Sequence, residues 1–406
     1  MIAHTRSAVS VSSRRSALIL VGLSLCVLGC AETMGDNGAG GTGASPTGGT
    51  GGTGGTGGSA PTGPFVVTAD WLNQTLTLLD YDLLVDGSSG ADDAIVRTID
   101  LSNWLPGPLE LELTPDGQTA VVSIAPGFFD GNGFTNMLVG SPTVPPGGTL
   151  LVVDLETGEA VSIETEDVPM GIAISPDGTT AYTANFGTTD FRGDSLSIID
   201  LTTLEVVEEI TVGPGPEQVV LSPDGTLGAV NVAGDDGIRV FQTADVSGTL
   251  TDVVPTAADP SDLAFLGDNT CLLVANSQNL SLSLVDTSNP AAPVEIDRVS
   301  TVGTPYGVTY VPARNVSLIP TSPLASNLMA QWATASTDES TITLGPAMRL
   351  DGGPFVLTAA VDESGDFAFV AHPVDQRLSI VDLETGTVRS VSWLTDTGPT
   401  YVAVQR

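Results

Sequence analysis

Few side chains in this sequence have the types and spacing that catalysis requires, and the best group begins at residue 372. His372, Asp375 and Arg377 span six residues, so one loop would hold an imidazole, a carboxylate and a guanidinium. Such a set can move protons to and from a bound substrate. Arg192, in a separate loop, is the fourth candidate. If the chain is an enzyme, we expect these residues to carry the chemistry.

Two loops that contain phenylalanine are the candidate ligand-binding segments. Aromatic residues make up 5% of the chain, and long loops that carry them are more often functional than short connections are. The alternative is that the rings turn inward and pack their own loops. The candidates are Phe128, Phe129, Asp130 and Phe134 in the first loop, and Phe186, Phe191 and Arg192 in the second.

The same two loops contain oxygen atoms that suit Ca²⁺, which takes about six to eight oxygen ligands. The candidate ligands are Asp130, Asn132, Asp190 and Asp194. The pattern lacks the later glutamate of an EF-hand loop. The alternative is that these side chains are surface acids in contact with solvent and bind no metal. We expect no other cofactor. His372 is the single histidine beyond the first 30 residues, which excludes a multi-histidine copper or zinc site.

The first 30 residues have the pattern of an export signal. Three arginines precede an apolar run of 12 residues, 17–28, which is shorter than the ~20 residues that a membrane-spanning helix needs. The run leads into Val27-Leu28-Gly29-Cys30, which resembles a bacterial lipobox. We therefore expect residues 1–29 to be a lipoprotein signal peptide and Cys30 to be lipidated. An ordinary signal peptide that is cut nearby is the alternative.

Residues 30–64 are rich in Gly, Thr, Ser, Pro and Ala, a composition that forms a flexible coil. Such a tether reaches roughly 30–35 Å on average. Ala31 follows the cysteine, which resembles lipoproteins that are sorted to the outer membrane. We expect an extracytoplasmic domain that acyl chains on Cys30 anchor to the bacterial envelope.

The charge of the chain limits its partners. All 12 basic residues are arginine, and three of them lie in the first 15 residues. The rest of the chain has nine arginines and 48 acidic residues, a net charge of −39. That excess excludes a nucleic-acid backbone and suits metal cations, cationic ligands or solubility alone. We expect a monomer that meets the membrane through Cys30 and binds a protein, glycan or small molecule.

From Phe65 onward a short sequence motif typical of a tight turn recurs. Proline presets the first turn position, aspartate bonds to the following backbone, and glycine or asparagine takes the left-handed conformation. Each phrase therefore predicts a tight turn between two strands. The phrases close at Gly117, Gly178, Gly225, Asn269, Asn315 and Gly365, with spacings of 61, 47, 44, 46 and 50 residues.

A period in the forties with several short strands per unit is typical of a β-propeller. The unit at 171–213 has four apolar runs, and seven first strands can be counted. We predict an all-β, seven-bladed propeller of four-stranded antiparallel blades over residues 65–406. The blade in which Gln242 replaces a repeated aspartate should be irregular. The first strands begin near Glu110, Gly171, Gln218, Asp262, Gly307, Val356 and Tyr401.

The two ends of this region predict how the ring closes. Residues 399–404 form a first strand with no partners after it, whereas 65–68 begin the domain as a second strand. We expect the last strand to lie inside the first blade, because closure removes open sheet edges. His372 then takes the strand end that Asn185 or Asn276 fills in other blades, which favours a capping role over catalysis.

The repeat resembles that of the YVTN-repeat propellers, with its Ser-Pro-Asp-Gly turn and its strands of Tyr-Val-Ala-Asn, Ser-Val-Ile-Asp and Thr-Ile-x-Val-Gly type. The unit at 171–213 matches all four parts, and the unit from Tyr306 to Leu350 matches poorly. The resemblance implies the propeller fold. It leaves the function open, since the family includes lactonase-like proteins, parts of redox enzymes, surface-layer proteins and binding modules.

Two functions follow from these observations. We favour a lipid-anchored binding or scaffold module that uses the channel face bearing the Phe128 and Phe191 loops. The alternative is a lactonase-like hydrolase that acts on a small lactone or sugar derivative through His372, Arg192 or Arg377 with aspartates at the channel mouth. The sequence contains no Gly-x-Ser-x-Gly nucleophile motif, which argues for the first.

Overall fold

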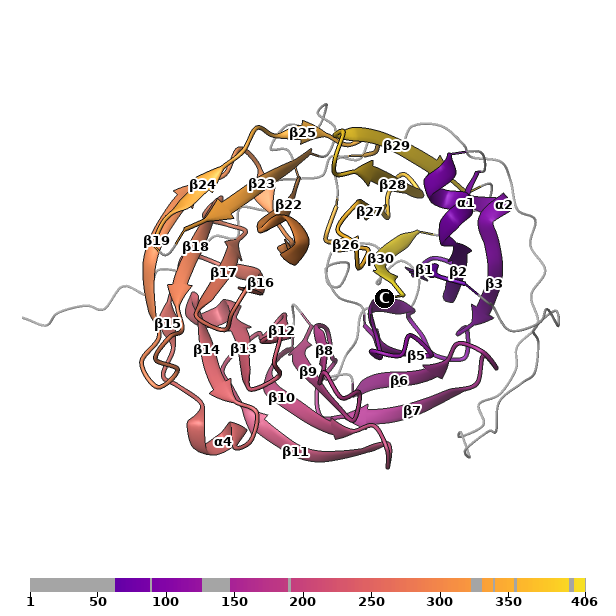
Figure 1. Cartoon of the computed structure of the whole chain (residues 1–406). Coiled ribbons are helices and arrows are strands. Elements are labelled where there is room, and N and C mark those ends of the chain that lie inside the picture. The colour runs from indigo at the N-terminus through magenta and orange to yellow at the C-terminus, as the bar shows by residue number, and fades with distance from the viewer. Residues whose placement is uncertain are drawn as a thin grey trace, which may run out of the picture. The chain divides into compact units, whose positions relative to one another are not determined.

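The computed structural model describes residues 63–87, 90–125, 147–188, 191–322, 331–338, 340–353, 356–393 and 398–405. All of them belong to the second of the two units into which the chain divides, residues 50–406. Seven antiparallel sheets follow one another around a ring (Figure 1), which confirms the predicted seven-bladed β-propeller. None of the described helices is long and apolar enough to cross a membrane.

We number the blades along the chain and give their strands from the channel outward. Blade 1 contains β30 (Pro399–Val404), β1 (Phe65–Asp70), β2 (Thr75–Asp80) and β3 (Ile95–Asp100). Blade 2 contains β4 (Pro108–Leu113), β5 (Thr119–Ile124), β6 (Gly148–Asp154) and β7 (Ala160–Thr165). Blade 3 contains β8 (Ile172–Ile174), β9 (Thr180–Gly187), β10 (Arg192–Asp200) and β11 (Glu205–Thr211).

Blade 4 contains β12 (Val219–Leu221), β13 (Leu227–Val232), β14 (Gly237–Gln242) and β15 (Val254–Pro255). Blade 5 contains β16 (Pro260–Leu266), β17 (Cys271–Asn276), β18 (Ser281–Asp286) and β19 (Val294–Ser300). Blade 6 contains β20 (Thr304–Pro305), β21 (Thr309–Val311), β22 (Val316–Ser322), β23 (Gln331–Thr337), β24 (Ile342–Leu344) and β25 (Met348–Arg349). Blade 7 contains β26 (Ala359–Val361), β27 (Phe367–His372), β28 (Arg377–Asp382) and β29 (Thr387–Ser392).

The C-terminal strand closes the ring, as the sequence predicted. Strand β30 pairs antiparallel with β1 and forms the innermost strand of blade 1 (Figure 1). The Thr400 hydroxyl lies 3.1 Å from the carbonyl oxygen of Ala69 and 2.8 Å from that of Leu109. Because Ala69 belongs to blade 1 and Leu109 to blade 2, this side chain links the closing strand to its neighbour in blade 1 and to blade 2.

The recurrent turns have the predicted geometry in most blades. Gly117, Gly178 and Gly225 have φ values of 67° to 72°, in the left-handed region that glycine adopts without strain. Asn315 is left-handed too, with φ of 51°. The expectation for Asn269 is wrong, because Gly267 takes the positive φ of 55° in that blade. A glycine two residues earlier closes the turn more readily than asparagine does.

Blades 4 and 6 depart from the regular pattern. After Gln242, blade 4 continues into the short helix α4 (Val246–Thr249), and its outer strand β15 has two residues, so the predicted irregularity is confirmed. In blade 6 the innermost position is divided between β20 and β21, and the outermost between β24 and β25. Pro305 ends β20, and proline cannot donate the hydrogen bond that a longer strand would need.

The core consists of apolar layers between successive blades. Leu76 and Leu78 of blade 1 pack with Val122 and Leu151 of blade 2, and all four are fully buried. Between blades 7 and 1, the helices α1 (Tyr81–Asp86) and α2 (Ala91–Ala94) add side chains to a similar layer. Since close packing resists displacement, these layers hold the innermost strands in fixed positions around the channel.

Candidate functional site

Several predicted site residues lie outside the described part of the chain. Of the four calcium candidates, Asp194 alone is described, and it is exposed on β10. The described residues contain no cluster of three His, Cys, Asp or Glu side chains that could hold a metal ion. The candidates that lie outside are Phe128, Phe129, Asp130, Asn132, Phe134 and Asp190, together with the lipidation candidate Cys30.

The described part of the second phenylalanine loop belongs to blade 3. Phe186 is buried against Leu109, Val168 and Met170, so this ring turns inward and packs its loop. Phe191 is half-buried, and its backbone N–H donates to the Thr188 hydroxyl at 3.0 Å. The exposed Arg192 places its guanidinium carbon 5.8 Å from the centre of the Phe186 ring, within the range of a cation–π contact.

His372 is a strand-end cap. It is fully buried at the end of β27, and its Nε2 lies 2.8 Å from the Ser379 hydroxyl. Asn185 and Asn276 occupy the equivalent positions and donate to Ser197 and Ser283 at 2.7 and 2.9 Å. Burial lowers the pKa of His372 to about 4, so the imidazole is neutral at neutral pH. Its burial leaves it no access to a substrate in this structure.

The four catalytic candidates do not form one site. Arg192 lies in blade 3, whereas His372, Asp375 and Arg377 lie in or beside strands of blade 7. Three blades separate these groups in one direction around the ring and two in the other. Arg377 pairs instead with Asp351, with 3.7 Å between Nη1 and Oδ1, and Asp375 is exposed.

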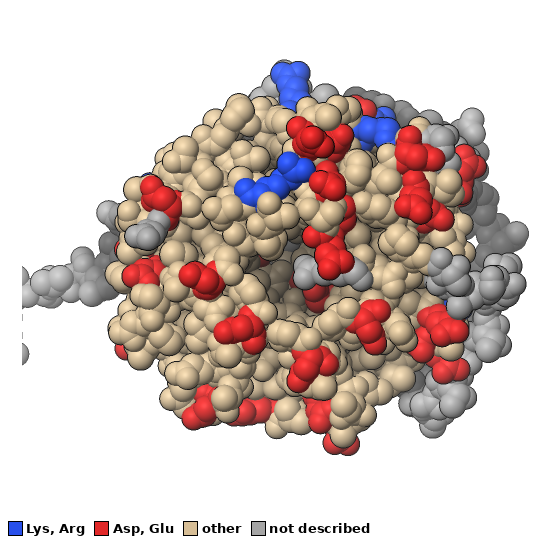
Figure 2. Space-filling model, in the orientation of Figure 1, with Lys and Arg blue, Asp and Glu red and all other residues tan. Residues whose placement is uncertain are grey.

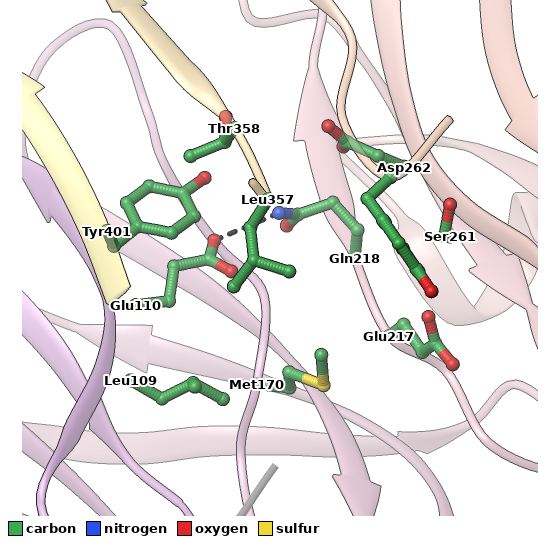
Figure 3. Close-up of a pocket in the computed structure, with 11 residues that line it drawn as sticks. Leu109, Glu110, Met170, Glu217, Gln218, Ser261, Asp262, Leu357, Thr358 and Tyr401 are labelled. Carbon is green, nitrogen blue, oxygen red and sulfur yellow. Dashed lines mark hydrogen bonds between the residues drawn. The ribbon is translucent and has the colours of Figure 1, made fainter. Parts of the chain in front are cut away.

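A cavity of about 40 Å³ lies at the centre of the ring, where the innermost strands begin (Figure 3). That volume holds roughly three water molecules at about 10–15 Å³ each. Its walls come from residues in or just before the first part of successive innermost strands, so all seven blades contribute to it. They are Leu109, Glu110, Met170, Glu217, Gln218, Ser261, Asp262, Tyr306, Leu357, Thr358 and Tyr401.

The cavity lies toward the face that the sequence analysis assigned to a ligand. The innermost strands begin where the second strands end, since Pro108 pairs with Ile124 and Pro260 with Asn276. The loops that join second to third strands therefore surround this end of the channel. Figure 2 shows one face of the propeller, on which acidic residues outnumber basic ones around a central hollow.

Two of the three acids in the cavity also join blades to each other. Glu110 Oε1 accepts hydrogen bonds from Gln218 Nε2 at 2.9 Å and from the backbone N–H of Ile172 at 3.1 Å. Asp262 accepts from the N–H groups of Leu263 and Val308, both at 2.7 Å. Glu110 thus connects blade 2 to blades 3 and 4, and Asp262 connects blade 5 to blade 6.

Glu217 differs from these two acids. Its side chain is 6% exposed, and no hydrogen bond to its carboxylate comes from the described residues. Burial raises its pKa well above the ordinary value, the charge of Asp259 adds to the shift, and the charge of Arg192 opposes it. Figure 3 shows Glu217, Ser261 and Asp262 on one side of the cavity, with Glu110 and Tyr401 on the other.

Burial sets the protonation of the other two acids as well. It raises the pKa of Glu110 from 4.5 to about 8 and that of Asp262 from 3.8 to about 7, although hydrogen bonds lower both. Carboxyl groups with such values exchange protons near neutral pH, which is common at functional sites. The cavity therefore combines exchangeable protons with an acidic environment.

In the sequence, Glu110, Gln218 and Asp262 could be recognised only as the starts of strands. The signal that could have revealed the site is the contrast with Gly171 and Gly307, which occupy the same position in other blades. A Cβ atom on Gly171 would lie 2.5 Å from Gln218 Cα, and one on Gly307 would lie 2.3 Å from the Leu357 carbonyl oxygen. Packing therefore requires glycine at these two positions. It does not require an acid at the same position of other blades, so Glu110 and Asp262 indicate a role other than packing.

Comparison with known proteins supports the fold. Residues 259–301, which span blade 5, match the LVIVD repeat. No curated protein sequence matches the chain.

Three solved structures illustrate the similarity. The periplasmic gluconolactonase PpgL of Pseudomonas aeruginosa is 16% identical over 84% of this chain and 98% of its own, with a TM-score of 0.62. A functionally unknown protein from Desulfotomaculum acetoxidans is 15% identical over 84% and 98%, with a TM-score of 0.64. The hydrazine synthase of Kuenenia stuttgartiensis is 19% identical over 74% and 90%, with a TM-score of 0.58. At these identities the likeness concerns the fold alone, which is that of the β-propeller proteins.

Proposed function

We propose that this protein is a ligand-binding module and that the cavity at the centre of the ring is its binding site. The observation that carries the proposal is Glu217, a carboxylate 6% exposed in the cavity wall without a hydrogen bond from the described residues. Burial without a partner disfavours the ionised form of this carboxyl group, and a cationic ligand that donated hydrogen bonds to it would stabilise that form. Concave sites with a few convergent polar groups are typical of small-molecule binding.

The N-terminal pattern supports an envelope location for this module. We propose that lipidated Cys30 anchors the chain to the outer membrane and that the Gly/Thr-rich segment holds the propeller away from the membrane surface. The recurrent turn and strand motifs support the proposal that the propeller is of the YVTN-repeat type. In this proposal the protein captures a small molecule, glycan or peptide outside the cytoplasm.

Thermal unfolding of the full chain tests the binding function. A panel of hexoses, uronic acids, amino acids, alkyl amines and lactones is added in turn, and at least one class is expected to raise the melting temperature. Met170→Phe enlarges a side chain in the cavity wall and should abolish the increase. Val294→Phe makes the similar change on the exposed outer strand β19 and should preserve it. If no class stabilises the chain, or if Met170→Phe retains the increase, the channel is not the binding site.

A lactonase is the second candidate function. Glu217 is the candidate general base because it is a carboxyl group in the cavity wall, and PpgL, which has a similar fold, is a gluconolactonase. Acid release from glucono-1,5-lactone, followed in a pH-stat, tests this function. Catalysis by the full chain that Glu217→Gln lowers by about 100-fold or more would support it. Equal rates with and without protein would exclude this substrate.

A further inference from the structure

We propose that the central cavity binds the ammonium group of an organic cation, with Glu217 as its counter-ion. The inference rests on the proposed binding function and names the class of ligand. Three properties of the cavity support the inference. The Glu217 carboxyl group is a hydrogen-bond acceptor without a donor from the described residues, the charged side chains among the described residues of the wall are acidic, and the volume is small and lies beside apolar surfaces.

The acceptor is the Glu217 carboxylate. Glu110 accepts two hydrogen bonds at Oε1, and Asp262 accepts one at each of its two oxygens, so the protein itself holds both of these carboxyl groups. Glu217 is 6% exposed and has no such bond from the described residues. An ammonium group has three donors and a full positive charge, so it satisfies a carboxylate that the protein leaves unbonded.

The walls favour a positive ligand over a neutral or negative one. Three carboxyl groups line the cavity, and among the described residues of its wall none is an arginine. The charges of Asp259 and Asp262 both act on Glu217 to disfavour its ionised form. Arg192 attracts Glu217, but the two make no ion pair within the described part of the chain. A bound cation therefore lowers the electrostatic free energy of the whole group, whereas an anion raises it.

The volume limits the shape of that cation. A space of about 40 Å³ holds roughly three water molecules, and a compact ammonium group fits such a space. Leu109, Met170 and Leu357 offer apolar surface to an alkyl chain, and the rings of Tyr306 and Tyr401 can face a cation. A metal ion is disfavoured, because the described residues contain no cluster of three suitable ligands.

Isothermal titration calorimetry of the full chain with n-butylammonium chloride tests the inference. Butan-1-ol, which has the same chain length without the charge, and CaCl₂ serve as matched probes. We expect butylammonium to bind, butan-1-ol and Ca²⁺ to bind at least tenfold more weakly, and Glu217→Gln to weaken butylammonium at least tenfold. Glu205→Gln, an equivalent change on the exposed strand β11, should leave the affinity unchanged.

The outcomes separate this inference from the function on which it rests. Absence of butylammonium binding, or equal affinity in the Glu217→Gln and wild-type chains, overturns the inference. If a neutral sugar or lactone stabilises the chain and Met170→Phe abolishes that effect, the binding function stands while the cation class is wrong. Tight binding of Ca²⁺ that Glu217→Gln removes would replace the organic cation with a metal ion. Unchanged circular dichroism and melting temperature of the variants without ligand show that each one folds.

Discussion

The charge of Glu110 should make the propeller less stable in mild alkali than in mild acid. Its pKa is raised from 4.5 to about 8 because the carboxyl is buried, and the charges of Asp262 and Glu112 add to the shift. A carboxyl with a higher pKa in the folded state stabilises the fold in its protonated form. That stabilisation is fully present below the unfolded pKa of 4.5 and is lost as the pH rises through about 8.

The size of the effect follows from the shift. Each unit of pKa difference between the folded and unfolded states corresponds to about 1.4 kcal/mol. Ionisation of Glu110 should therefore lower the unfolding free energy by about 3 kcal/mol between about pH 5 and pH 8. Glu110→Gln keeps an oxygen that can accept from Gln218 and Ile172, and it cannot ionise. The variant should therefore match the wild-type chain near pH 5 and be about 3 kcal/mol more stable near pH 8.

Guanidinium denaturation of both chains at the two pH values measures this difference. Asp70 and Asp262, whose pKa values are also raised to about 7, are present in both chains, so their effects largely cancel. Glu205→Gln, on the exposed start of β11, should follow the wild-type chain at both values. A Glu110→Gln variant that loses as much stability as the wild type between pH 5 and pH 8 would refute the reasoning.

Three further predictions concern the cap, the closure and the anchor. His372→Asn should change the unfolding free energy by less than about 1 kcal/mol, because asparagine already fills the equivalent position twice. His372→Leu should cost about 1–3 kcal/mol, because the buried Ser379 hydroxyl loses one of its two partners and keeps only Ser390; urea denaturation compares the two variants. Thr400→Val removes the hydroxyl that bonds to Leu109 and should lower stability by about 1–2 kcal/mol, and a thermal midpoint at or above that of wild type would contradict this. Cys30→Ser should abolish labelling by an alkyne fatty acid in cells and release the protein from membranes, and retained labelling would place the lipid elsewhere.

The site could be predicted only in part. The residues that the sequence analysis singled out for chemistry were those with unusual types in long loops, and Phe186 and His372 proved to be buried packing and capping groups. The cavity acids could not be recognised from the sequence, because each lies near or just before the start of an ordinary strand. Glu110 and Gln218 are 108 residues apart in the sequence, yet Gln218 Nε2 lies 2.9 Å from Glu110 Oε1. No local pattern indicates such a contact.

The sequence by itself determined the blades. Turn residues, apolar strands of even spacing and a first strand left without partners act within one blade or between neighbouring strands, so they can be recognised along the chain. The tertiary structure decided which polar side chains meet at the channel, which of them bond to an adjacent blade, and that Glu217 does not. The reason is that protonation and ligand preference depend on burial and on the distances between charges from all around the ring, and those distances exist only once the ring has closed.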